Sequence, residues 1–316
     1  MEQRTSQAEL FPVGLTVGAK IDDTAKETQK ALDQLFTLTQ QYQSSASLHA
    51  LLSFVGRFRF YSPYNSMLIH VQMPGATFVA PPHRWLSQYS RHIRTGARPI
   101  VILKPKGPVM FVFDVSDTEA EADAPPLPAE VINPFEVSRG HVEKEWDMTI
   151  ENAKRDGVRC ILQAAGSQSA GSIRSIPPAG FQDVFVRRVS PIETKKVQIR
   201  YDLLINKNLS RPARFATMTH ELAHLYCGHL GTSDSTWWPD RAYLPLECRE
   251  FEAESICYLV CTRLGIDNPS EAYLQGHLRA GGDVPPISLE AVMSASGLIE
   301  RMGRQWLPLR KPGTKP

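Results

Sequence analysis

The chain has 316 residues, of which 42% are hydrophobic and 22% are charged. This composition excludes wholesale disorder, and the length is enough for one large hydrophobic core or two ordinary ones. The net charge is only +2, so the distribution of the charges is more informative than their sum.

The sequence predicts a cytoplasmic protein that does not cross a membrane. Its longest apolar runs, such as residues 256–261, are far shorter than the ~20 residues of a membrane-spanning helix. The first residues lack the charged-then-apolar pattern of a signal peptide. The five cysteines include no Cys-x-x-Cys pair, which favours reduced thiols over a disulfide framework.

The first third of the chain is predicted to combine helices with a pair of strands. Leucines and a phenylalanine at helical spacing predict a mostly helical segment over residues 22–57. The apolar stretch 65–73 fits a helix or a strand, and residues 85–93 fit a short amphipathic helix. Two β-branched and aromatic runs, 100–103 and 109–115, predict two strands joined by a turn that contains Pro and Gly.

An acidic, proline-rich segment follows. Residues 117–134 contain five acidic residues and four prolines and show no periodicity, which predicts a solvated linker or a long loop. We therefore expect a linker at 118–135 between an N-terminal domain at 20–117 and a second domain at 136–310.

The second domain is predicted to have strands followed by helices, which is typical of an α+β fold. Ser210 is a predicted N-cap for a helix that begins at Arg211, with Pro212 in its first turn. The other predicted elements are a helix at 141–156, strands at 158–163, 184–189 and 197–201, and helices at 246–264, 269–279 and 288–306.

The strongest functional signal is the motif His220-Glu221-Leu222-Ala223-His224 within the helix that follows Ser210. Positions i and i+4 share one face of a helix, so both imidazoles can bind one Zn²⁺ at about 2.0–2.1 Å. Glu221 points about 100° away and can take a proton from water that the metal activates, which makes it the predicted catalytic base. The competing interpretation is a histidine pair without a metal, but the apolar neighbours favour burial, and buried histidines need partners.

A catalytic zinc site needs a third protein ligand and one open position. His229 lies nine residues after His220, on the opposite face of a continued helix, and does not match the metzincin spacing. Cys227 is on the same face as His220 but about 10.5 Å along the axis, so it is predicted to be a small core residue.

The predicted helix 246–264 offers better candidates. Three carboxylates and two thiols share one of its stripes, namely Glu247, Glu250, Glu254, Cys257 and Cys261. Glu250 is the predicted third ligand. Glu254 is predicted to accept the free N–H of a ligating histidine and is the alternative ligand. Glu252 is on the opposite face and is expected to be solvated, and the acids of the stripe could also form a solvent face. The ligand types suit Zn²⁺ but also Mn²⁺, Fe²⁺ or Co²⁺.

These residues resemble known metallopeptidases. His-Glu-x-x-His followed by a helical Glu is similar to the gluzincin arrangement. Residues 250–266 resemble the second zinc helix of ArdC-type antirestriction proteins, and the wider ImmA/IrrE metallopeptidase group shares a Glu-x-x-Ala pattern there. The segments 219–229, 270–274 and 288–306 are also similar to ArdC-type proteins. The resemblance implies a zincin metallopeptidase domain with Zn²⁺ as cofactor.

The N-terminal half is strongly basic. Residues 34–113 contain no Asp or Glu but eight Lys or Arg, a local net charge of +8. Aromatic residues alternate with the bases, a combination that suits the phosphates and bases of single-stranded nucleic acid. The predicted nucleic-acid-binding residues are Arg57, Arg59, Tyr61, Tyr64, Asn65, Arg84, Trp85, Lys104 and Lys106. The competing interpretation places the aromatics in a core and pairs the bases with the acidic segment, which could also occupy the basic groove.

This half also looks like the single-stranded-DNA-binding domain of ArdC-type proteins, and the resemblance implies a small α/β domain for residues 20–117. The likeness rests on residues 61–69, Trp85, the turn at 94–96, and the runs 100–103 and 112–116. The sequence departs from that pattern in the turn, which continues with Ala97 in place of an acid, and in its acidic-proline insert.

Three functions follow as hypotheses. The first is a zinc metallopeptidase linked to a single-stranded-DNA-binding module, the second is a non-catalytic DNA-binding antirestriction protein with a structural zinc, and the third is an ImmA-like peptidase that cleaves a repressor. The candidate oxyanion stabilisers are Tyr226, His229, Tyr243 and Tyr258. The loop with Trp237 and Trp238 either lines a substrate cleft or is anchored by these rings.

Overall fold

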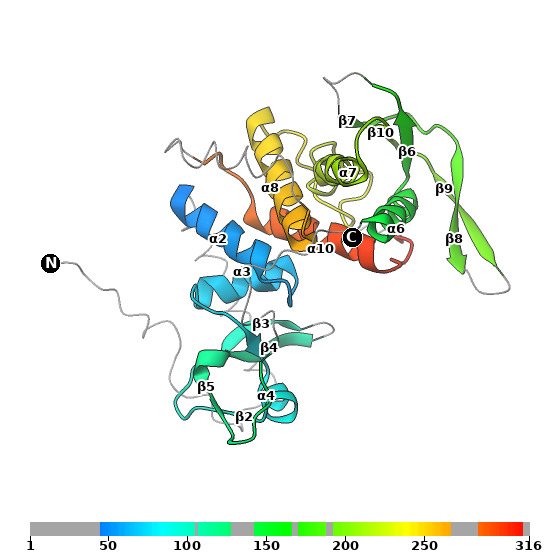
Figure 1. Cartoon of the computed structure of the whole chain (residues 1–316). Helices are drawn as coiled ribbons and strands as arrows, with labels where there is room; N and C mark the ends of the chain where they lie inside the picture. The colour runs from blue at the N-terminus through cyan, green and yellow to red at the C-terminus, as the bar shows by residue number, and fades with distance from the viewer. Residues whose placement is uncertain are drawn as a thin grey trace.

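The computed structural model describes residues 45–104, 107–127, 142–165, 170–187, 192–266 and 284–311. It has a mixed α+β fold with several small sheets (Figure 1). Lys106, the helix predicted at 269–279 and the beginning of the helix predicted at 22–57 lie outside the described residues.

The N-terminal half alternates helices with short strands. Its elements are α2 (Ser45–Arg57), α3 (Pro63–Gln72), β1 (Val79–Ala80), α4 (Pro82–Tyr89), β2 (Arg91–Ile93), β3 (Ile100–Lys104), β4 (Gly107–Asp114), the 3-10 turn η3 (Val115–Asp117) and β5 (Thr118–Ala120). Strands β1, β4 and β3 form one antiparallel sheet with β4 in the middle. The stretch 65–73 is a helix because Ser62 caps α3 and Pro63 occupies its first turn.

Two predictions for this half need correction. The helix predicted at 85–93 ends at Tyr89, because Ser90 adopts a left-handed conformation with φ of 46° and the next residues form β2. The predicted linker also begins too early. Thr118–Ala120 form β5, which pairs with β2 in an antiparallel ladder.

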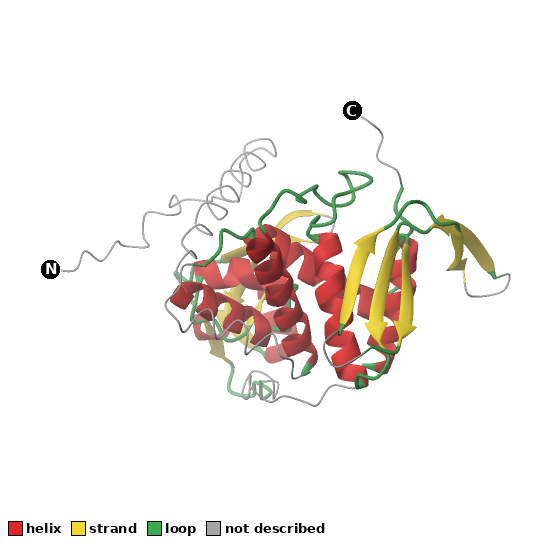
Figure 2. Cartoon of the chain, turned by 90° about the horizontal axis from the view of Figure 1, so that it is seen from above, coloured by secondary structure: helices red, strands yellow, loops and turns green. Residues whose placement is uncertain are grey.

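The C-terminal half consists of α6 (Glu143–Arg155), β6 (Val158–Gln163), β7 (Gly171–Ser175), β8 (Phe181–Arg187), β9 (Glu193–Gln198), β10 (Tyr201–Asn206), α7 (Arg211–Tyr226), α8 (Leu246–Leu264) and α10 (Leu289–Arg304). One sheet has the order β6-β10-β7, in which β6 is parallel and β7 antiparallel to β10. Strands β8 and β9 form a separate hairpin that projects from the body (Figure 2). The structure confirms the predicted bounds of β6 and α8.

Three strands differ from expectation in this half. The strand predicted at 184–189 corresponds to β8, which begins earlier, at Phe181. The strand predicted at 197–201 spans the junction between β9 and β10, where Arg200 donates its backbone N–H to Gly157. Strand β7 was not predicted, because Gly-Ser-Ile-Arg-Ser contains a single large apolar residue. Among the described strands, β7 lies at an edge of its sheet and packs beside α7.

The main buried core is continuous between the two halves. Helix α2 packs on α8, and α3 packs on α10, so that Leu51 and Phe54 belong to the same apolar cluster as Phe215 and Ile256. Among the described residues, the two sides of the predicted linker at 118–135 therefore share one main core. The division into domains stays a prediction. Among the described residues, no helix is long and apolar enough to cross a bilayer.

Candidate metal centre

Helix α7 presents the His-Glu-x-x-His motif to α8. Ser210 caps the helix by accepting the backbone N–H of Ala213, and Pro212 lies in the first turn, as predicted. Leu222 and Leu225 are fully buried on the apolar face. This packing fixes the rotation of the helix and points both motif histidines toward α8.

The structure brings His220, His224 and Glu250 together. The Nε2 atoms of the two histidines are 3.2 Å apart. The Glu250 carboxylate lies 3.5 Å from His220 Nε2 through one oxygen and 3.6 Å from His224 Nε2 through the other. One ligand atom from each residue falls within 4.8 Å of the others, which makes the three a candidate metal-binding group.

These separations fit one small divalent cation. Ligand atoms about 2.05 Å from a tetrahedral Zn²⁺ lie about 3.3 Å from one another. The 3.2 Å between the two Nε2 atoms, and the 3.5 and 3.6 Å from them to the two oxygens of Glu250, are close to that value. The donor set of two imidazoles and a carboxylate is also that of open zinc sites that keep a fourth position for water or substrate.

Glu221 and the edge strand β7 line the same pocket. The pocket has a volume of about 270 Å³ and is bounded by the metal-ligand candidates, Glu221, His229, Arg249 and the backbone of residues 171–173. Burial raises the pKa of Glu221, while a hydrogen bond from the backbone N–H of Ile173 opposes the shift. A carboxylate with a raised pKa in a pocket is suited to accept and return a proton near neutral pH.

Glu254 lies where a partner of a ligating histidine is expected. Its carboxylate is 3.5 Å from His220 Nδ1, the nitrogen that does not face the candidate metal position. Burial alone would lower the pKa of His220. The hydrogen bond to Glu250 and the charges of Glu254 and Glu221 outweigh it, and the pKa rises to about 9. Three carboxylates around one imidazole make a strongly cation-attracting site.

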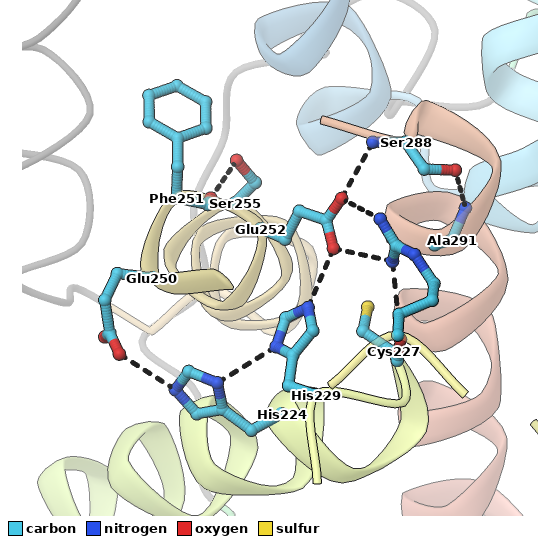
Figure 3. A network of polar contacts seen from close by, with 10 residues as sticks. His224, Cys227, His229, Glu250, Phe251, Glu252, Ser255, Ser288 and Ala291 are labelled. Atoms are coloured by element: carbon cyan, nitrogen blue, oxygen red, sulfur yellow. Dashed lines mark hydrogen bonds and ion pairs between the residues drawn. The ribbon is translucent and has the colours of Figure 1, made fainter. Parts of the chain in front are cut away.

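Two residues that the sequence placed away from this site belong beside it. Helix α7 ends at Tyr226, and Gly228 turns the chain back with a φ of 77°, so His229 is not on a continued helix. His229 Nδ1 is 3.0 Å from His224 Nδ1, and His229 Nε2 is 2.9 Å from Glu252 (Figure 3). Glu252 does lie on the opposite face of α8 from the ligand stripe, but it is fully buried rather than solvated.

A second group of possible metal ligands, formed by Cys227, His229 and Glu252, is not favoured as a metal site. Its ligand atoms also lie within 4.8 Å of one another. However, Arg241 donates to both carboxylate oxygens of Glu252, at 2.6 and 2.7 Å, and supplies the positive charge that a metal would bring. Burial also raises the pKa of the Cys227 thiol, which disfavours the thiolate that would bind a metal.

Most of the predicted oxyanion stabilisers lie elsewhere. Tyr226 is buried and donates its hydroxyl to Asp156 at 2.9 Å. Neither Tyr243 nor Tyr258 is among the described residues that line the pocket, whereas His229 is. Arg249, which the sequence analysis missed, contributes a cationic side chain to the pocket. Arg249 directly precedes Glu250 in the sequence, and no motif there indicated a role in the pocket.

The loop between α7 and α8 is anchored by its tryptophans. Trp238 is 4% exposed, packs edge-on against Tyr226 and donates its indole N–H to Gly231. Trp237 packs against Trp238. Neither ring is among the described residues that line the pocket, so of the two interpretations of this loop, the structure favours anchoring.

Two of the predicted nucleic-acid-binding residues serve the fold. Trp85 is 0% exposed and donates its indole N–H to the carbonyl of Phe113 at 2.9 Å, which contradicts a base-stacking role. Asn65 donates to and accepts from the backbone of Leu103, with both bonds at 3.0 Å. Its amide therefore holds α3 against β3.

The remaining predicted residues lie in two settings. Arg57 and Lys104 are exposed, and Arg84 is half-buried with its Nε donating to Gln88 at 2.6 Å. Arg59, Tyr61 and Tyr64 instead line a second pocket.

This second pocket has a volume of about 570 Å³ and lies between residues 59–64 and helix α10. Phe60, 45% exposed, adds another aromatic face, and α10 contributes Arg301 and Arg304. Burial raises the pKa of both Tyr61 and Tyr64 to about 12, so both phenols stay protonated at neutral pH.

Comparisons with known proteins return remote similarity. No protein-family model matches the chain. An uncharacterized protein of Bacillus anthracis is 21% identical over 297 residues, and the match covers 82% of this chain and 48% of that relative. The chain thus spans about half the length of the curated relative that it matches.

Among solved structures, the chain matches the antirestriction protein ArdC from plasmid R388, crystallised in a metal-free state. The match has a TM-score of 0.33 and 14% identity and covers 83% of this chain and 94% of ArdC. This is the type of protein that the sequence motifs resemble. The assignment of the site rests on the side chains of this chain alone.

Proposed function

We propose that the chain is a metal-dependent peptidase, with His220, His224 and Glu250 as metal ligands and Glu221 as the catalytic base. The observation that carries the proposal is geometric. The two imidazole Nε2 atoms are 3.2 Å apart, each lies 3.5 or 3.6 Å from one oxygen of the Glu250 carboxylate, and a carboxylate with a raised pKa shares their pocket. A divalent ion bound there would polarise a substrate carbonyl and lower the pKa of water, with Zn²⁺ the ion that best fits the ligands.

The residues around the ligands have complementary tasks in this proposal. Glu221 takes the proton of the attacking water and returns it to the leaving nitrogen. Arg249 offers positive charge for the oxygen on which negative charge develops. The backbone of β7 lines the pocket as a sheet edge, and an extended peptide can bind such an edge through main-chain hydrogen bonds. This edge favours a peptide over a compact small molecule.

Two variants of the motif test the enzymatic proposal. Glu221→Gln should retain metal and lose cleavage of an unstructured protein substrate by about 10²-fold or more, because only the proton acceptor is removed. His224→Ala should lose both metal and cleavage. Equal cleavage by wild type and Glu221→Gln would refute peptidase chemistry at this site.

The ligand assignment has its own test, which does not need a substrate. Elemental analysis of Glu250→Ala should show loss of the metal, whereas Glu254→Ala should retain it with weaker affinity, because Glu254 lies nearest the outer nitrogen of His220. Metal loss only in Glu254→Ala would exchange the two roles. Retention of a metal by both variants as in wild type would refute the site.

We also propose that the chain binds single-stranded DNA, and the second pocket favours this. Arg59, Arg301 and Arg304 surround Phe60, Tyr61 and Tyr64 there, which combines phosphate-binding cations with stacking faces. The pocket has three arginines against two acids, Glu290 and Glu300, and Glu300 pairs with the buried Arg263 as well as with Arg304. Affinity for an oligonucleotide should fall steeply with salt and fall again in Arg301→Ala. Absent or salt-independent binding would refute it.

An antirestriction role for the chain rests on the motifs in its sequence, and the similar plasmid protein carries that name. Two other functions remain distinguishable by experiment. If the chain is a DNA-binding protein with a purely structural metal, wild type and Glu221→Gln should bind DNA equally well, and neither should cleave protein. A repressor-cleaving peptidase would prefer an acidic protein to single-stranded DNA.

A further inference from the structure

A line of buried polar contacts leads away from His224 to the far side of α8. His224 Nδ1 meets His229 Nδ1 at 3.0 Å, and His229 Nε2 meets Glu252 at 2.9 Å (Figure 3). Glu252 also accepts two hydrogen bonds from Arg241 and one, at 2.7 Å, from the backbone N–H of Ser288. His229 and Glu252 are 2% and 0% exposed, so water does not compete for these contacts.

The direction of these hydrogen bonds follows from the Glu252 end. Arg241 donates to both carboxylate oxygens of Glu252, and the backbone N–H of Ser288 donates to one of them, so the carboxylate is held as an acceptor. The ionised carboxylate only accepts, so His229 must donate from Nε2. The two Nδ1 atoms face each other at 3.0 Å, so one must donate and the other accept, and His224 can ligate through Nε2 only if His229 Nδ1 is the acceptor.

The acceptor at His229 Nδ1 determines which nitrogen of His224 can bind a metal. His224 must donate from Nδ1, and its Nε2 then carries a lone pair. That lone pair belongs to the atom that lies 3.2 Å from His220 Nε2 and faces the candidate metal position. The backbone reinforces the arrangement, because His229 also donates its N–H to the carbonyl of His224 at 2.9 Å.

We propose that His229 and Glu252 are positioning residues that hold His224 in its ligating tautomer and orientation. The proposal rests on the metal site described above. It also gives roles to Arg241, in the loop after α7, and to the beginning of α10, because both hold Glu252. The two ligand histidines are thus oriented differently, His220 next to a carboxylate directly and His224 through a second histidine.

A pair of substitutions separates this role from plain packing. His229→Leu removes both the acceptor and the donor, while Glu252 keeps Arg241 and Ser288 as partners. His229→Gln keeps an acceptor and a donor on one side chain. The measurement is affinity for Co²⁺ and Zn²⁺ by chelator competition, with the visible absorption of the Co²⁺-loaded protein as a second readout.

The affinity of His229→Leu should fall about 10- to 100-fold and its Co²⁺ absorption bands should shift, whereas His229→Gln should recover most of the affinity. A folded His229→Leu protein with wild-type affinity and absorption would overturn the proposal. Failure of wild type itself to bind either metal would refute the proposed metal site instead, so the two failures are distinguishable.

A measurement on the unmodified protein covers the case in which His229→Leu does not fold. Long-range ¹H–¹⁵N spectra of histidine-labelled wild type report the tautomer of each imidazole. The proton should lie on Nδ1 of His224 and on Nε2 of His229. The opposite tautomer at His224 would overturn the proposal whether or not a metal is added.

Discussion

Arg263 contacts several elements of the fold, and removing its side chain should lower the stability of the protein. It lies near the C-terminal end of α8 with a fully buried side chain, and it forms a buried ion pair with Glu300 of α10. It also donates to the backbone carbonyls of Val55, Phe58 and Tyr61, at distances of 2.8, 2.8 and 2.5 Å. One guanidinium therefore joins α8, α10, the end of α2 and the segment after α2.

The cost of Arg263→Met can be worked from these contacts. Methionine fills similar space but leaves the 4%-exposed side chain of Glu300 without its buried partner and three carbonyls without their donor. Breaking a buried ion pair by removing one partner costs about 3–5 kcal/mol. At about 2–4 °C per kcal/mol for a chain of this size, the melting temperature should fall by about 6–20 °C.

Thermal unfolding followed by circular dichroism measures this effect, and the chain offers a matched control. Arg304 lies 3.9 Å from the same carboxylate but is 49% exposed, so Arg304→Met should cost less than about 1 kcal/mol. Replacing Glu300 together with Arg263 by methionine should be milder than the sum of the single changes, because no buried charge is orphaned. An Arg263→Met protein that melts like the Arg304→Met control would refute the reasoning.

Further predictions concern pH, backbone, charge and metal. Burial lowers the pKa of His70 to about 4, below its unfolded value, so folding stability should be lost as pH falls from 6.5 toward 4. The free energy of unfolding, measured with urea, should fall by about 2 kcal/mol between pH 7 and 5. This loss should be absent in His70→Gln. Gly228→Ala should cost about 2 kcal/mol or more by the same method, because its φ is 77° and a Cβ would overlap the carbonyl of Pro239; wild-type stability would contradict this. Arg249→Gln should lower kcat about 10²-fold at unchanged metal content, and an unchanged kcat would exclude Arg249 from oxyanion stabilisation. Zn²⁺ at 100 times its Kd should stabilise the protein by about 2.7 kcal/mol, and EDTA should reverse the rise in melting temperature.

The sequence predicted helices α7 and α8 well because their signals are local. Ser210 and Pro212 define the beginning of α7, and a continuous helical pattern defines α8. The helical stripe then placed Glu250 and Glu254 on one face, which is the face that α8 turns toward His220. Each of these inferences needs only the 3.6-residue period of a helix.

The rest could not be predicted because it depends on where the chain turns and what covers a face. The helical period placed Glu252 on the opposite face correctly, but nothing local indicates that Arg241 and Ser288 would bury that face. Likewise, the ring of Trp85 fits stacking or core equally well in sequence, and only the fold supplies the carbonyl of Phe113 that accepts its N–H. Strand β7 is defined by its pairing with β10 rather than by its own composition.

Helix α8 shows why charged residues are tolerated inside this core. Buried charges are costly unless each has a partner, and α8 directs its charges to different elements. Glu250 and Glu254 face α7, Glu252 faces the loop after α7 and the beginning of α10, and Arg263 faces α10 and the segment after α2. These polar contacts tie the helix to several different elements, and together they fix its rotation and its position along its axis. A helix held in this way presents Glu250 to the two histidines in a defined place, which a ligand set on the surface of a single helix could not achieve.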